Sequence, residues 1–345
     1  MKPRFCTMLL CTLVFGLSVA IQPACGETED NRSLVRLRLS ALPTVSSAPI
    51  YIALHEGYFT EHGIDLEIVK FKSSSDALPA LAQGQLEIVT GSVSATFYNA
   101  IARGLQVKAV ADKTHKTPDD RSSAIMVRSE LYHQQAVRSL ADLAGRSLAF
   151  SGRGRKMEYL LEETLAHWGL TFNEVEPVYL AQTARAQALQ TGAVDAALLA
   201  EPLVTRLLLS GHGEILVYDG ELYSELSVSP QTSLVYFGPT LLVDQPQWGR
   251  RFMLAYLRGV RTYNEGKTPR NLEIIARYTG LEPEILAQTG WPHINPDGRM
   301  ATEGIPEFQQ WLLRQGLMDD EISLDALFDP SFAAWAADTL SKRES

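Results

Sequence analysis

Three segments within residues 35–71 decide the fold: VRLRLS at 35–40, PIYIALHEG at 49–57 and DLEIVKF at 65–71. The first and third are short runs in which apolar residues recur, and such runs are typical of β-strands. The middle segment is mostly apolar and ends on Gly57, which is typical of a helix closed by a glycine. A strand, a helix and a second strand in this order predict a βαβ unit.

The same alternation continues along most of the chain. It predicts further strands over residues 86–89, 107–111, 123–127, 147–150, 176–180, 194–199, 215–218 and 234–243. It predicts further helices over residues 74–83, 92–103, 156–168, 183–191 and 202–209. From residue 247 onward the chain reads as helices and loops, with Met253, Leu257 and Val260 on one helix face.

The pattern begins afresh after the fifth predicted strand, so the elements form two βα sets. Crossings near residues 122–126 and 232–240 join the sets, which predicts an α/β protein of two lobes. Lobe I is discontinuous and covers 34–122 plus 240–340, and lobe II covers 123–239. In such sheets ligands bind beyond the carboxyl ends of the strands, where helix N-termini point their N–H groups outward. We therefore expect the binding site in the cleft between the lobes.

The first 26 residues differ from the rest of the chain. Lys2 and Arg4 form a positive region, and residues 8–21 are apolar and uncharged. A secretory signal peptide over residues 1–26 has this pattern, and an apolar core of roughly 14 residues is short for a membrane span. Its removal takes away two basic residues and no acidic one, so the net charge changes from −9 to −11.

Cysteine placement agrees with export of the mature chain. The three cysteines are Cys6, Cys11 and Cys25, and no cysteine follows Cys25. An exported chain without later cysteines has no disulfides, so it must rest on its hydrophobic core. Cys25 leaves two alternatives open, because it is either the lipid-bearing first residue of a lipoprotein or part of a simple cleavage site. In both cases the protein is expected outside the cytoplasm, in the periplasm or its equivalent.

Composition and motifs exclude several classes of function. The net charge of −9 argues against a nucleic-acid-binding surface, which would show a basic footprint. The seven histidines include no pair at metal-ligand spacing, and neither a Gly-x-Ser-x-Gly elbow nor a Walker A loop occurs. We therefore expect no catalytic residue, no metal and no cofactor.

The stretch SGRGRKM at residues 151–157 is the one phosphate-like motif, because it follows a predicted strand and opens a predicted helix. Its glycines let backbone N–H groups approach an anion, and Arg153 or Arg155 could hold an oxyanion through charge-assisted hydrogen bonds. Arg153 is the expected binding residue, with Arg155 as the control if its side chain points outward. The alternative is a structural turn with two solvated arginines.

Hydroxyl-rich segments follow two other predicted strands. TGSVSAT at 90–96 follows the third strand, and either Ser92 or Ser94 could cap the next helix while the other meets a ligand. ALPTVSSAP at 41–49 lies between the first strand and helix. Both segments are predicted to give the cleft polar walls.

Four stretches carry a family resemblance. Residues 49–59 (PIYIALHEGYF) look like the first-helix motif of periplasmic solute-binding proteins for nitrate, taurine, sulfonates and thiamine pyrimidines, the NMT1/THI5-like family. Residues 63–67 (GIDLE), 98–104 (YNAIARG) and 192–197 (GAVDAA) are similar to its later stretches. The resemblance spans about residues 34–280 and implies a type II periplasmic-binding fold.

That resemblance implies a protein that closes on one small polar or anionic molecule and delivers it to an ABC permease, as a monomer without nucleic-acid partners. The ligand-binding residues that it implies are Thr44, Ser46, Ser47, Ser92, Ser94, Ser151, Arg153, Gln182 and Glu201, to which the glycine-rich motif adds Arg155. Two alternatives share the fold. One is a biosynthetic enzyme of the pyrimidine-synthase or menaquinone-pathway kind, and the other is a ligand-sensing subunit of a membrane receptor.

Overall fold

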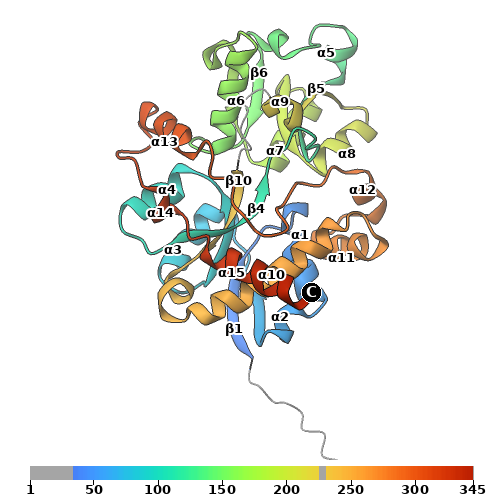
Figure 1. Cartoon of the computed structure of the whole chain (residues 1–345). Helices are drawn as coiled ribbons and strands as arrows, with labels where there is room; N and C mark the ends of the chain where they lie inside the picture. The colour runs from blue at the N-terminus through green and yellow to red at the C-terminus, as the bar shows by residue number, and fades with distance from the viewer. Residues whose placement is uncertain (1–33, 225–230, 345) are drawn as a thin grey trace, which may run out of the picture. The chain divides into compact units, whose positions relative to one another are not determined.

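The computed structural model describes residues 34–224 and 231–344, in which the chain forms two five-stranded sheets with helices packed on them. The predicted signal peptide, Cys25 and the rest of residues 1–33 lie outside the described residues. Figure 1 labels the elements used below. We call each sheet with its helices a lobe.

The first lobe is built on the sheet β2-β1-β3-β10-β4. Its strands are β1 (Val35–Ser40), β2 (Ile64–Ile68), β3 (Ile88–Ser92), β4 (Lys108–His115) and β10 (Gln231–Phe237). The helices before β4 are η1 (Val45–Ser47), α1 (Ala48–His55), α2 (Tyr58–Glu61), α3 (Ser74–Ala82) and α4 (Ala95–Ala102). After β10 come η4 (Thr240–Asp244), α10 (Pro246–Asn264), α11 (Pro269–Thr279), α12 (Pro283–Gln288), α13 (Ile305–Arg314), α14 (Leu324–Leu327) and α15 (Ser331–Glu344).

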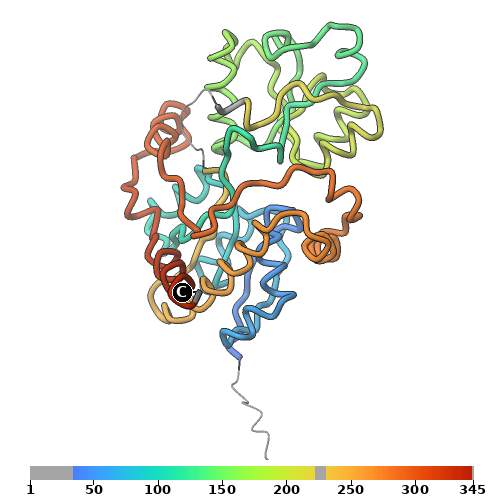
Figure 2. The backbone as a smooth tube through the Cα atoms, turned by 45° about the vertical axis from the view of Figure 1, so that its right-hand side comes forward, coloured from blue at the N-terminus to red at the C-terminus, as the bar shows by residue number. Residues whose placement is uncertain are grey.

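The second lobe is built on the sheet β7-β6-β8-β5-β9. Its strands are β5 (Ser123–Arg128), β6 (Ser147–Phe150), β7 (Glu176–Tyr179), β8 (Ala196–Ala200) and β9 (Gly213–Tyr218). Its helices are α5 (Ser129–His133), η2 (Leu140–Leu143), α6 (Lys156–His167), η3 (Phe172–Glu174), α7 (Gln182–Thr191), α8 (Leu203–Leu209) and α9 (Asp219–Ser224). The green and yellow tube of this lobe can be followed in Figure 2.

The two sheets share one plan. Three strands run parallel in each, β2-β1-β3 in the first and β7-β6-β8 in the second. The strand that arrives from the other lobe, β10 or β5, then pairs antiparallel with its neighbours on both sides. The parallel strands confirm the predicted βαβ units. The chain passes between the lobes twice, because it enters the second sheet at β5 and returns to the first sheet at β10.

Two sequence expectations differ from the structure at β10. The predicted strand over 234–243 ends at Phe237, and Thr240–Asp244 is a π-helix, because Pro239 cannot donate a hydrogen bond to the sheet. The sequence predicts that the run over 234–243 returns toward the first βα set, and β10 does pair in the first sheet with β3 and β4. The expected lobe boundary at residue 239 therefore falls after this strand instead of before it. The chain thus re-enters the first sheet at Gln231, and the rest of the predicted lobe division stays a prediction.

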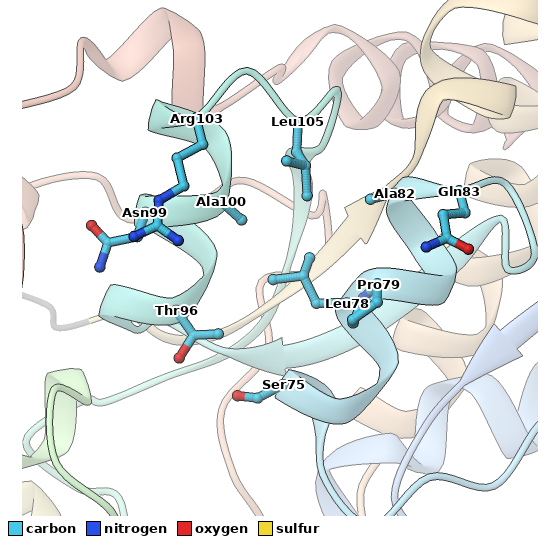
Figure 3. A pocket seen from close by; sticks show the side chains of 10 residues that line it. All are labelled: Ser75, Leu78, Pro79, Ala82, Gln83, Thr96, Asn99, Ala100, Arg103 and Leu105. Carbon is cyan, nitrogen blue, oxygen red and sulfur yellow. The ribbon is translucent and has the colours of Figure 1, made fainter.

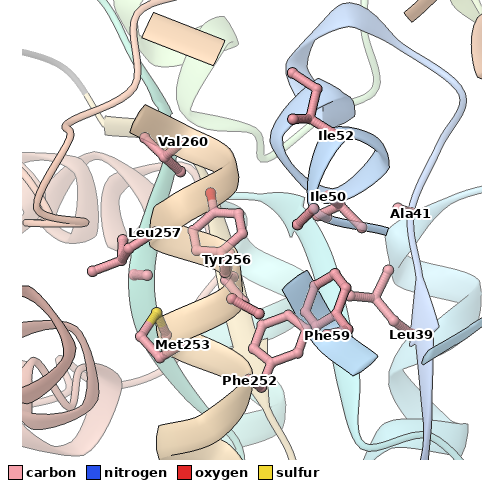
Figure 4. Close-up of a cluster of buried hydrophobic side chains, with 14 of the residues drawn as sticks. Leu39, Ala41, Ile50, Ile52, Phe59, Phe252, Met253, Tyr256, Leu257 and Val260 are labelled. Carbon is pink, nitrogen blue, oxygen red and sulfur yellow. The ribbon is translucent and has the colours of Figure 1, made fainter. Parts of the chain in front are cut away.

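The largest core cluster lies where α10 packs on α1 and α2, and β1 contributes side chains to it (Figure 4). Its labelled side chains include Leu39, Ile50, Phe59, Phe252 and Tyr256, all fully buried. The predicted apolar face of α10 is therefore confirmed. Within the described residues, no helix combines the length and apolar character needed to cross a membrane.

Gly259 allows the close packing of α10 on α1. A Cβ atom at this position would lie 2.2 Å from the carbonyl oxygen of Pro49 and 2.9 Å from the Cβ of Ala53. Neither atom is the end of a flexible side chain, so the two helices would have to move apart. The glycine is thus required by the distance between the helices, because any side chain would overpack the contact.

We expect Gly259→Ala to lower the free energy of unfolding by about 1–3 kcal/mol, the usual cost of overpacking. Chemical denaturation monitored by tryptophan fluorescence would measure it. Gln247→Ala, at an exposed position of the same helix, is the control and should change stability by less than about 0.5 kcal/mol. Equal stability of both variants would mean that α10 and α1 are not held at this distance in solution.

Candidate functional site

A cavity of about 610 Å³ lies at the carboxyl ends of strands from both lobes. First-lobe residues that follow β1 and end β3 form one wall, and segments that follow β6, β7 and β8 form the other. Ligands of open α/β sheets bind at such strand ends. The cleft predicted from the sequence is therefore present as a cavity.

The structure brings seven of the ten predicted site residues to this cavity. They are Thr44, Ser46, Ser92, Ser151, Arg155, Gln182 and Glu201. Ser47, Ser94 and Arg153 do not line it: Ser47 and Ser94 are buried in the first lobe, and Arg153 is exposed. Ser94 is the N-cap residue of α4, but its hydroxyl makes no capping hydrogen bond, contrary to one of the two alternatives considered from the sequence.

The turn before α6 is held against the first lobe by backbone hydrogen bonds. Ala95 N donates to Gly154 O at 2.9 Å, and Lys156 N donates to Val93 O at 3.1 Å. Gly154 N in turn donates to the carboxylate of Glu158 at 2.6 Å. The N–H groups of Gly154 and Lys156, which the sequence suggested for an anion, are thus already used within the protein.

The hydrogen bonds between this turn and the first lobe reverse the expected roles of the two arginines. Arg155 lines the cavity and donates from Nη1 to Ser92 Oγ at 3.1 Å, whereas Arg153 is exposed. Burial lowers the pKa of Arg155 from its usual value. The sequence could not separate the two, because both flank Gly154 and only the contact with the first lobe decides which one turns inward.

Arg185 of α7 is a site residue that the sequence analysis missed. Its side chain lines the cavity and is only 7% exposed. Nη1 donates to Leu198 O at 2.5 Å, while the buried Nε has no hydrogen-bond partner. Burial and, to a lesser degree, the neighbouring charge of Arg155 lower its pKa to about 10. Among the described residues, neither Arg155 nor Arg185 forms a salt bridge with a carboxylate.

Lys113 of β4 is a second residue that the sequence did not reveal. It is 6% exposed, lines the cavity and donates from Nζ to Ser46 Oγ at 2.6 Å. Ser46 Oγ lies 2.9 Å from Thr44 Oγ1, so lysine and hydroxyls form one chain. Burial lowers the pKa of Lys113 to about 7, although the charge of Asp112 opposes this shift. The predicted strand covers residues 107–111 and β4 extends to His115, so the sequence placed Lys113 just beyond a strand, where a single lysine reads as an ordinary solvated residue.

Three other ionisable groups of the cavity, Lys116, Lys156 and Glu201, have partners in the protein, and Lys72 of the lining is exposed. Lys116 lies 2.9 Å from Asp219 and 3.4 Å from Asp120. Lys156 Nζ donates to Gly304 O at 2.5 Å, and burial lowers its pKa to about 8. Glu201 accepts hydrogen bonds from the backbone N and the hydroxyl of Thr205 at 3.0 and 2.9 Å.

Cationic groups therefore predominate in the cavity of a chain whose overall charge is −9. Glu201 is the one acidic residue of its lining among the described residues, and it is engaged with Thr205. Because the remaining charge of the chain is negative, attraction of an anion has to come from these local groups. This arrangement suits a small anion with several hydrogen-bond acceptors.

A second cavity, of about 650 Å³, lies between α3 and α4 (Figure 3). Half of its ten lining residues are apolar (Leu78, Pro79, Ala82, Ala100 and Leu105), and it contains one charged residue, Arg103. This cavity lacks the converging buried polar groups of the first. Residues 34–224 and 231–344 also contain no group of three or more His, Cys, Asp or Glu side chains placed to hold a metal ion.

Comparison of the sequence with known families gives a direct match. The sequence pattern described as NMT1/THI5 like matches residues 44–265, which is more than half of the chain. The chain belongs to this family. A protein of Escherichia coli (strain K12) named for binding aliphatic sulfonates is 26% identical over 227 residues. That match covers 64% of this chain and 64% of the relative, slightly less than two thirds of its length.

Solved structures share the fold at lower sequence identity. The alkanesulfonate-binding protein SsuA from Xanthomonas axonopodis pv. citri, bound to MOPS, has a TM-score of 0.67 and 20% identity, over 85% of this chain and 98% of that one. The desulfurization enzyme DszB, as a mutant in complex with biphenyl-2-sulfinic acid, has a TM-score of 0.62 and 17% identity, over 88% and 99%. These likenesses confirm the predicted two-lobed α/β fold, which both binding proteins and an enzyme use.

Lys113 should make stability depend on pH. Its pKa is about 7 in the folded protein against an ordinary 10.5, so between these values the unfolded chain binds the additional proton. The free energy of unfolding then rises with pH, and Lys113 contributes at most about 1.4 kcal/mol per pH unit. Lys113→Met should flatten this rise between about pH 7 and about pH 10 in urea unfolding experiments. The exposed Lys70→Met is the control, and identical slopes for the wild type and Lys113→Met would contradict the prediction.

Proposed function

We propose that this protein is an extracytoplasmic solute-binding protein that captures a small organic anion, with sulfonates as the first class to test. The observation that carries this proposal is the pair Arg155 and Arg185, two buried or half-buried guanidinium groups that meet at the cavity without a carboxylate. Burying a charge without a counter-ion is costly. An anionic ligand would supply that counter-ion.

The donors of the site match an oxyanion. Arg155 extends from the second lobe to Ser92 of the first, so an anion bound there would contact both lobes and favour their closed arrangement. The unpartnered Nε of Arg185 is a further donor. The relatives named for sulfonate binding support the same chemistry, and taurine, nitrate and a pyrimidine remain the competing ligands for the test.

Delivery to an ABC permease is the proposed fate of the ligand. The proposal rests on family membership and on the relatives named for sulfonate binding. An enzyme on the same fold is the alternative, since DszB is one. Residues 26–345 contain no cysteine, so a reaction that requires a cysteine nucleophile is not open to the mature chain. Recovery of the bound ligand unchanged after incubation would favour transport or sensing over catalysis.

Calorimetric titration with an alkanesulfonate, taurine, nitrate and a neutral pyrimidine tests the binding function. We expect a sulfonate to bind most tightly and Arg155→Ala to weaken it at least tenfold, because one charge-assisted hydrogen bond contributes about 1.5–3 kcal/mol. Arg153→Ala, in the same turn but exposed, is the matched control and should stay within about twofold. Equal affinity in the wild type and Arg155→Ala would show that Arg155 does not bind the ligand.

Export is proposed on the leader at residues 1–26, and the mature form is proposed to be a monomer. Intact mass of protein from the outer compartment of a Gram-negative-type host should correspond to a chain that begins near residue 25 or 27. A mass increase on Cys25 would identify the lipid-anchored form, whereas its absence would identify the soluble form. Exported protein that retains Met1 would rule out both forms.

A further inference from the structure

Both lobes contribute cationic groups to the cavity. Among its lining residues, Lys116 is neutralised by Asp120 and Asp219, and Lys156 points to the carbonyl of Gly304. The remaining buried or half-buried cations are Lys113 in the first lobe and Arg155 and Arg185 in the second. Each of these three donates to a neutral oxygen instead of a carboxylate.

The first-lobe group consists of Lys113, Ser46 and Thr44. The lysine donates to Ser46 at 2.6 Å, and the serine and threonine hydroxyl oxygens lie 2.9 Å apart. The carboxylate of the preceding residue, Asp112, is engaged elsewhere: it accepts from Gln231 Nε2 and Asn295 N at 2.6 and 2.8 Å, and it contacts the His115 ring at 2.8 Å. An ammonium group and two adjacent hydroxyls can all donate to one oxyanion.

The second-lobe group consists of Arg155 and Arg185. Arg155 is bound to Ser92, at the end of β3, whereas Lys113 is bound to Ser46, in η1. The two groups therefore share no partner and belong to different lobes. Their common cavity of about 610 Å³ lies in the size range of sites for drug-sized ligands, which is far larger than a single oxyanion requires.

From this juxtaposition we propose that the ligand carries two anionic groups, one bound by Arg155 and Arg185 and the other by Lys113 with Ser46 and Thr44. This inference rests on the proposed anion-binding function and goes beyond it by specifying the ligand class. A ligand with one charge leaves one of the two cationic groups without a counter-ion. A sulfonate with a carboxylate, or a second sulfonate, at its far end neutralises both.

The test compares matched ligands that differ in the second charge. The dianions are 3-sulfopropanoate and 4-sulfobutanoate, and their single-charge counterparts are propane-1-sulfonate and butane-1-sulfonate. Affinities are measured by calorimetry at about pH 6, below the pKa of about 7 of Lys113, and at constant ionic strength for wild type, Lys113→Met and Lys70→Met. Lys70 is exposed and outside the cavity lining, so it controls for the loss of one positive charge on the same lobe.

We expect wild type to bind at least one dianion at least tenfold more tightly than its single-charge counterpart. Lys113→Met should reduce that ratio to about threefold or less, and Lys70→Met should keep it. Thermal unfolding of both variants verifies that they are folded, and a ratio that is unchanged in folded Lys113→Met overturns the proposal. If wild type binds sulfonates of single charge equally well, the proposed function stands and the two-anion ligand is wrong. If neither kind of sulfonate binds, both proposals fail.

Discussion

The contact between the turn before α6 and the end of β3 brings the two walls of the candidate site together and positions Arg155. Two backbone hydrogen bonds, Ala95 N to Gly154 O and Lys156 N to Val93 O, join these turns as a short antiparallel bridge. Gly154 has a φ of 74°, and a Cβ atom there would lie 3.2 Å from the Cβ of Ala95. A glycine meets both demands, because it has no side chain and adopts positive φ without strain.

This bridge gives neighbouring residues different environments. Arg155 lies opposite Ser94 in the bridge and reaches Ser92, whereas Arg153 stays in solvent. Glu158 supports the turn by accepting from Gly154 N and from the hydroxyl of Tyr179, at 2.6 and 2.7 Å. Burial raises the pKa of Glu158, but these hydrogen bonds to its carboxylate oppose the shift. The position of one guanidinium group thus depends on contacts from both lobes.

The electrostatics of the cavity follow from which cations have carboxylate partners. At Lys116 two aspartates supply the counter-charge, and their attraction raises its pKa despite burial. At Lys113 and Arg185 hydroxyl and carbonyl oxygens take that place, so burial dominates and the pKa of each falls. A neutral oxygen provides a hydrogen bond without cancelling the charge, and this leaves the cavity attractive to an anion.

The sequence alone determined the βαβ repeats, the two-lobed fold and the strand ends where the site lies, because periodicity and glycine-ended helices are local properties of the chain. It also determined which loops carry hydroxyls, and seven of the ten residues singled out line the cavity. Only the tertiary structure decided that β10 pairs with both β3 and β4, that Arg155 instead of Arg153 turns inward, and that Lys113 and Arg185 reach the same cavity. The physical reason is that strand partners, burial and the distribution of counter-charges arise from contacts between residues far apart in the chain, and no local pattern encodes them.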